Sequence, residues 1–175
     1  MAKIVVAFRE RDAGETIASM LRESGYEVIR VCTAGDEVKR VFQMIQDGIL
    51  ICGFRLKDRT VDQILEDLSG RAEVLCISKA EQTAQLRAPH VFHITPPVKK
   101  SVLAAWADML VQLHYQRIPL REETDRDRIR QAKEKLMADR NITEKEAHRY
   151  LQKLSMRFGT PMSRVAEQIL ERNSE

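Results

Sequence analysis

The 175-residue sequence predicts an α/β fold, a doubly wound five-stranded parallel sheet followed by a smaller helical segment. Short apolar runs recur five times in the first hundred residues, and stretches with apolar residues at helical spacing separate them. Such alternation is typical of a parallel sheet with helices on both faces. Clear helix start and stop signals after Pro119 predict the helical segment.

The expected strands are residues 3–8, 26–32, 49–52, 73–78 and 90–95. We expect Gly25 and Gly48 to end the first and second intervening helices as capping glycines. A last helix begins near Val98, and its expected inner face carries Val102, Leu103, Trp106, Leu110 and Leu113. Pro119 is then expected to break or kink the chain, because proline has no backbone N–H to donate.

Composition narrows the class of protein. Hydrophobic residues make up 43% of the chain, which is ample for a packed core, and the net charge of +3 is too small for a polycation. An odd number of cysteines without a C-x-x-C spacing indicates buried reduced thiols at Cys32, Cys52 and Cys76. Without a long apolar run or a signal peptide, we expect a soluble, cytoplasmic protein.

The segment after Pro119 divides into a charged stretch and three helices. Residues 121–130, REETDRDRIR, hold eight charges of both signs, which is typical of a solvated helix or linker; a two-stranded coiled coil is the alternative. Thr143 and Glu146 have the spacing of a capping box that starts the second of these three tail helices, and Gly159 is placed to end that helix. Thr160 and Pro161 then begin the third helix.

Motifs of common α/β enzymes are missing from the sequence. It contains no G-x-G-x-x-G turn, no P-loop and no G-x-S-x-G nucleophile turn. The four histidines, His90, His93, His114 and His148, are scattered, and no two have the spacing of metal ligands. We therefore expect no catalytic residues, no cofactor and no metal site.

Residues 1–116 resemble the receiver domain of two-component response regulators, which has a flavodoxin-like (CheY-like) fold. The resemblance rests on five strand–helix units and on local sequence such as SMLRESGYEVIRV (19–31). Receivers transfer a phosphoryl group to an aspartate at the end of strand three. An acidic pair after strand one holds Mg²⁺, a Ser or Thr follows strand four, and a Lys-Pro pair follows strand five.

This chemistry is missing at the positions that the resemblance points to. Phe8 and Arg9 stand in place of the acidic pair, Gly53 in place of the phosphoacceptor and Pro96 in place of the lysine. Only Ser78 remains as a hydroxyl. Because metal ligands, acceptor and lysine are lost together, the resemblance implies a pseudo-receiver that is not phosphorylated and is not an enzyme.

Residues 128–170 resemble an ANTAR domain, the RNA-binding module of transcription antitermination regulators. The matching positions are Ala132, Lys133, Leu136, Met137, Thr143, Glu146, Ala147, Leu151, Ser155, Met156, Val165 and Ala166. One departure is His148, where a tyrosine or phenylalanine is common. Residues 129–172 also carry ten Lys or Arg against six Asp or Glu, whereas residues 1–120 are nearly balanced.

Basic residues recur every fourth position along the second helix, at Lys145, Arg149, Lys153 and Arg157, which predicts a slanted basic ridge. An ordinary solvated helix face is the alternative. The candidate RNA-binding residues are Lys133, Arg140, Lys145, Ala147, His148, Arg149, Lys153, Ser155, Met156, Arg157 and Arg164. His148 and Met156 are included as contacts for loop bases.

We therefore expect a pseudo-receiver at 1–116, a helical linker or coiled coil at 117–128, and an ANTAR domain at 129–172. The resemblance implies a homodimeric antiterminator that binds stem-loops in a nascent leader transcript, so that a terminator hairpin does not form. A ligand-sensing partner protein is a further implied contact. Two alternatives stay open: a DNA-binding regulator, and a protein-interaction adaptor that binds no nucleic acid.

Overall fold

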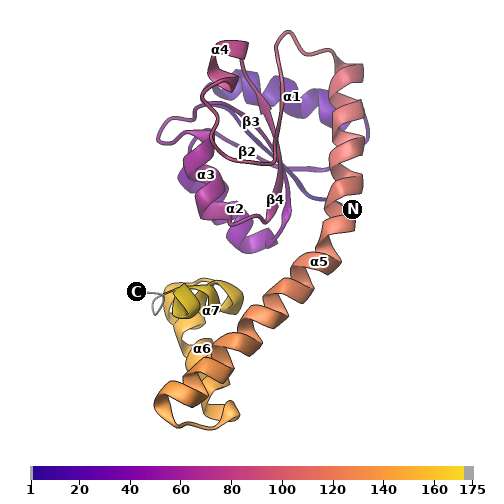
Figure 1. The fold of residues 1–175 in the computed structure, drawn as a ribbon. Coiled ribbons are helices and arrows are strands. Elements are labelled where there is room, and N and C mark those ends of the chain that lie inside the picture. The colour runs from indigo at the N-terminus through magenta and orange to yellow at the C-terminus, as the bar shows by residue number, and fades with distance from the viewer. Residues whose placement is uncertain (1, 172–175) are drawn as a thin grey trace. The chain divides into compact units, whose positions relative to one another are not determined.

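The computed structural model describes residues 2–171 and divides into two compact units, Met1–Gln116 and Arg117–Glu175 (Figure 1). Arg172, the last residue of the expected ANTAR domain, lies outside the described residues. The elements in chain order are β1 (Ile4–Ala7), α1 (Arg11–Glu23), β2 (Val28–Cys32), α2 (Gly35–Ile45), β3 (Gly48–Gly53), α3 (Val61–Leu68), β4 (Ala72–Ile77), α4 (Ala80–Thr83), β5 (Val91–Ile94), α5 (Lys100–Arg140), α6 (Glu144–Phe158) and α7 (Met162–Glu171).

The first unit is built on a five-stranded parallel sheet with the strand order β2-β1-β3-β4-β5, which confirms the predicted fold class. Every residue of β1 and β3 is buried. This burial explains why these strands are continuous apolar runs rather than alternating ones, since helices cover both faces of the sheet. The expected strands agree with the observed ones to within two residues at each end.

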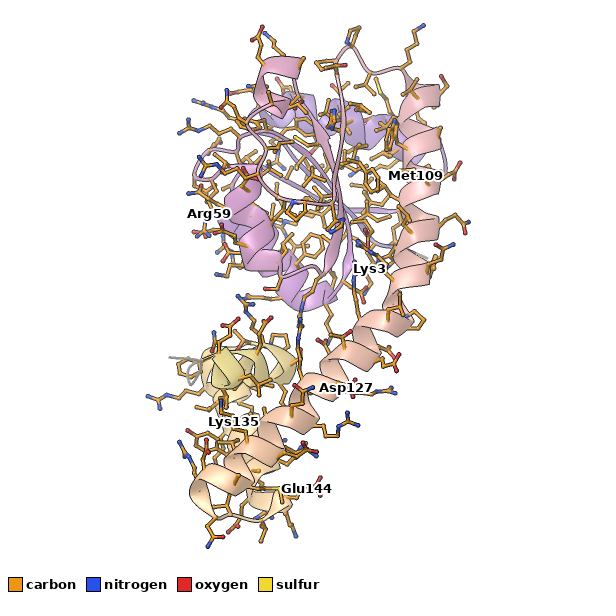
Figure 2. The ribbon with its side chains drawn as sticks, viewed as in Figure 1. Lys3, Arg59, Met109, Asp127, Lys135 and Glu144 are labelled. Carbon is orange, nitrogen blue, oxygen red and sulfur yellow. The ribbon has the colours of Figure 1, made fainter. Side chains whose placement is uncertain are left out.

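Each face of the sheet has its own core. On one face, α1 and the first part of α5 cover strand side chains such as Val6 and Ile51. On the other, α2 and α3 cover Val5, Leu50 and the three cysteines, all of which are buried and free, as predicted. Met109 of α5, labelled in Figure 2, packs against the core that contains Val6 and Ile51.

The two predicted capping glycines behave differently. Gly25 has the left-handed φ of 89° expected after α1. The prediction for Gly48 is wrong, because α2 ends two residues earlier, where Gln46 adopts a φ of 70°. Gly48 is instead the first residue of β3, and a Cβ there would lie 2.6 Å from the carbonyl oxygen of Lys3. Its missing side chain therefore allows close approach of two strands rather than a helix cap.

α5 continues from Lys100 to Arg140 and includes Pro119, so the chain does not break at this proline; a kink there, the other expected outcome, stays a prediction. An interior proline removes one helical hydrogen bond at a cost of roughly 3 kcal/mol, and the long helical stretches on both sides of it offset that loss. The inner face of α5 also differs, since Leu103, Ala107 and Leu110 are buried whereas Val102 is 43% exposed. Among residues 2–171 no helix, α5 included, is long and apolar enough to cross a membrane.

The second unit packs the C-terminal part of α5 against α6 and α7. Its core contains Ala132 and Leu136 from α5, Ala147 and Leu151 from α6, and Val165 and Ala166 from α7. The Nζ atom of Lys135 donates a hydrogen bond of 3.3 Å to the carbonyl oxygen of Leu170 near the end of α7 (Figure 2 labels Lys135). This contact pairs a cation with a helix C-terminus, which is the favourable sign.

Candidate functional site

α6 begins at the predicted capping box. The Thr143 hydroxyl accepts a hydrogen bond from the Glu146 backbone N–H, and the Glu146 carboxylate accepts one of 2.8 Å from the Thr143 N–H. The hydrogen bonds that the Thr143 N–H and hydroxyl donate to the Glu146 carboxylate hold the pKa of Glu146 below its ordinary value. Gly159 ends the helix in the left-handed conformation, with a φ of 59°. Both ends of α6 are therefore set by local sequence, and this fixes which side chains face the solvent.

The solvent face of α6 carries the four basic residues that recur at every fourth position of the sequence. We call them the basic ridge: Lys145, Arg149, Lys153 and Arg157. All four are exposed. Within residues 2–171, none of them lies within 4.0 Å of a carboxylate oxygen. Arg149 interacts with Glu146 only at longer range, so the row of exposed cations stays free of close ion pairs within residues 2–171 and is suited to binding a polyanion backbone.

Two further candidates lie beside the ridge. Met156 is 77% exposed and His148 is also exposed, so both side chains are accessible to a ligand. Ser155 is half-buried, and its hydroxyl donates a hydrogen bond of 2.6 Å to the carbonyl oxygen of Thr160. Ser155 therefore holds the turn between α6 and α7.

Ala147 does not belong to an exposed surface. Its side chain is completely buried in the core formed with Leu151 and Val165. The interpretation of Ala147 as an RNA-contacting residue is wrong for this structure, because its methyl group is covered by the neighbouring helices. A small residue is needed at this position for packing.

The remaining basic candidates already have partners inside the protein. Lys133 forms an ion pair of 2.6 Å with Glu144, and this hydrogen bond and charge hold the pKa of the Glu144 carboxyl below its ordinary value. Arg164 forms an ion pair of 2.6 Å with Glu167. Arg140 instead donates a hydrogen bond of 3.2 Å to the phenolic oxygen of Tyr150. The sequence does not separate these residues from the ridge, since their partners come from other helices or other turns.

In the first unit, the residues at the receiver phosphorylation positions lie at the carboxyl ends of the strands. Phe8 directly follows β1, and Gly53 is the last residue of β3. A Cβ built on Gly53 would lie 3.2 Å from Cδ1 and 3.6 Å from Cε1 of the Phe8 ring. The aromatic ring therefore occupies the space beside Gly53 into which an acceptor side chain would project.

The residues at the other receiver positions, Arg9, Pro96 and Ser78, carry no carboxylate. Arg9 is exposed and lies 3.8 Å from the Glu10 carboxylate, so it brings positive charge to the place of the acidic pair. Pro96 is exposed after β5 and precedes Pro97 through a cis peptide bond. The Ser78 hydroxyl is buried and lies 3.0 Å from the Thr83 hydroxyl. No cluster of three or more metal-ligating side chains occurs in the part of the chain that the structure describes.

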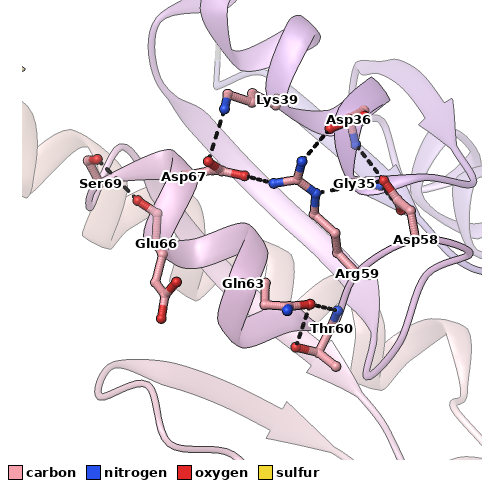
Figure 3. A network of polar contacts seen from close by, with 10 residues as sticks. All are labelled: Gly35, Asp36, Lys39, Asp58, Arg59, Thr60, Gln63, Glu66, Asp67 and Ser69. Carbon is pink, nitrogen blue, oxygen red and sulfur yellow. Dashed lines mark hydrogen bonds and ion pairs between the residues drawn. The ribbon is translucent and has the colours of Figure 1, made fainter.

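A network of polar contacts that the sequence does not reveal joins the loop after β3 to α2 and α3 (Figure 3). Arg59 lies at its centre, 2.6 Å from Asp36 and in an ion pair with Asp67, which also binds Lys39 at 3.0 Å. Asp58 accepts hydrogen bonds from the backbone N–H groups of Gly35 and Asp36, at 2.5 and 3.1 Å.

The role of Asp58 follows from this geometry. Burial by itself raises the pKa of the carboxyl, but the hydrogen bonds from Gly35 and Asp36 outweigh it and leave the pKa below its ordinary value. The carboxylate thus stabilises the N-terminus of α2 from a residue more than twenty positions away. Asp58 therefore serves the fold and is not a substitute metal ligand for the missing acidic pair.

Comparison with known proteins gives similarities for both units of the chain, a family match for the second and solved structures for the first. Residues 121–170 match the ANTAR domain family. No curated protein matches the chain in sequence. The expected division at residues 117–128 and 129–172 stays a prediction, since the family match begins inside the segment expected to be a linker.

Solved structures similar to this chain include receiver domains. The signal receiver domain of a modulated diguanylate cyclase from Desulfovibrio desulfuricans G20 has a TM-score of 0.59 at 17% identity, over 66% of this chain and 98% of that one. The receiver domain of the response regulator NarL from Mycobacterium tuberculosis has a TM-score of 0.52 at 17% identity, over 62% and 95%. The PhyR receiver domain from Erythrobacter litoralis has a TM-score of 0.55 at 12% identity, over 63% and 89%.

At these identities the likeness establishes the fold of the first unit and no activity. The two findings apply to different parts of the chain, since the receiver domains cover about two thirds of it and the family match lies at residues 121–170. The chain therefore combines an N-terminal domain of the receiver fold with a C-terminal segment, residues 121–170, that matches the ANTAR domain family.

Proposed function

We propose that this protein is a transcription antitermination regulator that binds stem-loops in a nascent leader mRNA and prevents formation of a terminator hairpin. The observation that carries the proposal is the basic ridge, four exposed cations on α6 that form no ion pair within 4.0 Å among residues 2–171. Phosphate neutralisation by such residues supplies most of the affinity in nucleic-acid binding. Exposed His148 and Met156 beside the ridge are suited to contact unpaired loop bases.

A DNA-binding function has less support. Recognition of duplex DNA by a helical tail usually places several polar or basic side chains of one helix against base edges. In α7 the basic residue Arg164 is already paired with Glu167. The uncompensated charge lies on α6 instead, which favours contact with phosphates and loops over reading of a major groove.

The N-terminal domain, in this proposal, is a pseudo-receiver that is not phosphorylated and has no enzymatic activity. Phe8 beside Gly53 and the positive charge of Arg9 support this, because phosphoryl transfer to aspartate needs both an acceptor carboxylate and carboxylates that hold Mg²⁺. A ligand-sensing partner protein or a change in abundance would then control the protein in place of a kinase.

The proposal also includes a homodimer, so that two ANTAR domains bind two stem-loops. Exposed apolar side chains along α5 support this part: Val102, Tyr115 and Leu120 are 43%, 47% and 64% exposed. Exposed apolar side chains on a helix are candidates for contact with a second copy of the chain, and because they are thirteen positions apart Val102 and Tyr115 offer two different sides of α5 for it. Sedimentation equilibrium of the purified protein, with and without hairpin RNA, tests the dimer.

The test of the proposed function is a binding measurement with three nucleic acids of equal length: an RNA with two adjacent hairpins, the same RNA with its loops replaced by continuous duplex, and duplex DNA. We expect the paired-hairpin RNA to bind most tightly. Preferential binding of duplex DNA would favour the DNA-binding alternative. Absence of binding to all three at low salt would favour an adaptor that binds protein only.

A further inference from the structure

We infer that Arg140 and Tyr150 form a preformed stacking platform for one unpaired base of the RNA loop. This inference rests on the proposed function and adds a specific contact to it. The basic ridge and the excess of basic residues explain contact with RNA phosphates, but they do not explain contact with a base. The platform would bind a different part of the ligand, the flat face of a nucleobase.

The two side chains are in direct contact in the structure. The guanidinium carbon of Arg140, the last residue of α5, lies 4.4 Å from the centroid of the Tyr150 ring in α6. One guanidinium nitrogen also donates a hydrogen bond of 3.2 Å to the Tyr150 hydroxyl oxygen. These two contacts restrain the planar group over the ring and its hydroxyl before any ligand binds.

Tyr150, the aromatic part of the platform, is anchored in the core of the second unit. Tyr150 is half-buried and packs against the cluster that includes Leu151 and Val165. A ring held by packing keeps its orientation, so the guanidinium above it is held as well. Binding a base to a preformed surface loses less conformational entropy than binding it to a mobile side chain.

Arg140, the cationic part of the platform, is accessible and forms no close ion pair. Arg140 is exposed, and within residues 2–171 no carboxylate oxygen lies within 4.0 Å of its guanidinium. In this respect Arg140 differs from Lys133 and Arg164, which are tied to Glu144 and Glu167. Because the guanidinium carbon lies over the Tyr150 ring, the side of the group turned away from the ring is the one available to a base.

The platform lies beside the basic ridge. Tyr150 and Lys153 are three residues apart on α6, a spacing that makes their side chains neighbours on the helix surface. A strand whose phosphates follow the ridge would therefore carry its bases past the platform. Unpaired loop bases in RNA are commonly recognised by stacking on aromatic rings or on arginine planes.

The second arginine–aromatic contact of the domain is a weaker candidate. The guanidinium carbon of Arg157 lies 5.6 Å from the centroid of the Phe158 ring, and both residues are exposed. A phenylalanine also offers no hydroxyl to hold the guanidinium in place. The Arg157 pair therefore lacks the two restraints that hold Arg140.

The test is the substitution Arg140→Lys, which keeps the positive charge and removes the planar surface. Binding is measured with a hairpin RNA carrying 2-aminopurine in turn at each loop position, because stacking quenches its fluorescence. We expect R140K to lower affinity by roughly 5- to 100-fold, the range for loss of one stacked base, without changing the dependence on salt. Quenching at one loop position should be present in the wild type and lost in R140K.

Abasic substitutions provide the double-mutant comparison. Removing the stacked base should weaken the wild type strongly and weaken R140K little further, since both changes remove the same contact. Arg130→Lys is the matched control, because Arg130 is ion-paired with Asp127 at 2.9 Å and lies outside the ridge and the platform. Tyr150→Phe, which keeps the ring but removes the hydroxyl that holds the guanidinium, should reduce the position-specific quenching.

Three outcomes overturn the platform: R140K binds as tightly as the wild type, quenching persists in R140K, or R130K loses as much affinity as R140K. They leave the proposed function intact if the wild type still binds the paired hairpins. Failure of the wild type to bind any hairpin RNA overturns the proposed function together with the platform. The two failures are therefore distinguishable from the wild-type measurement alone.

Discussion

Removal of the basic ridge gives the most direct quantitative prediction. Its four cations are exposed and unpaired within the described residues, so each is available to neutralise one phosphate. For single-stranded RNA the slope of log K against log salt is about −0.7 per phosphate neutralised, which predicts roughly −2.8 for the wild type. Substituting Lys145, Arg149 and Lys153 by alanine leaves Arg157 and a slope of about −0.7.

This difference is large enough to measure. For a rise in salt from about 50 to about 200 mM, these slopes predict a roughly 50-fold loss of affinity for the wild type and a roughly 3-fold loss for the triple variant. Fluorescence anisotropy of a labelled hairpin RNA over a salt series gives both slopes. Circular dichroism should show unchanged helix content, because the three side chains are exposed and α6 keeps its capping box and core.

A variant matched in charge separates the ridge from net charge. Arg11, Arg22 and Arg126 are exposed and ion-paired with glutamates of their own helices, so their replacement by alanine removes the same three charges elsewhere. This control should keep a slope near the wild-type value of about −2.8. An unchanged slope in the ridge variant, or an equal fall in the control, would refute the assignment of RNA binding to the ridge.

Four further predictions follow from the packing and the electrostatics. Thr143→Ala should lower the free energy of unfolding of the second unit by about 1 kcal/mol in thermal melts, and Thr143→Ser should restore most of it. Because the pKa of Glu146 is lowered in the folded state, its contribution is complete above the unfolded value of about 4.3 and is lost as pH falls through the folded pKa. Melts between about pH 5 and pH 3 should therefore depend on pH less in Glu146→Gln than in the wild type. Leu151→Ala should destabilise the fully buried core of the second unit by about 2–5 kcal/mol, seen in chemical denaturation. Incubation with a small phosphodonor and Mg²⁺ should leave the intact mass unchanged, and an acyl phosphate in the N-terminal domain would contradict the reading of Gly53.

Local signals account for the parts of the structure that the sequence predicts well. The apolar runs of β1 and β3 are buried on both faces, and the capping box of Thr143 forms as its spacing indicates. Errors occur where a local signal competes with packing. Gly48 has the right residue type for a helix cap but is needed where β3 approaches Lys3, and Pro119 lies inside a helix that is long enough to accommodate it.

The sequence by itself determined the α/β class, the helical tail and the ridge, because each depends on a period of a few residues along one segment. Only the tertiary structure decided which charges are free. Lys133 and Arg140 are equally basic in the sequence, yet one is neutralised by Glu144 and the other lies over the ring of Tyr150. These partners lie ten or more positions away along the chain, and folding alone brings them together.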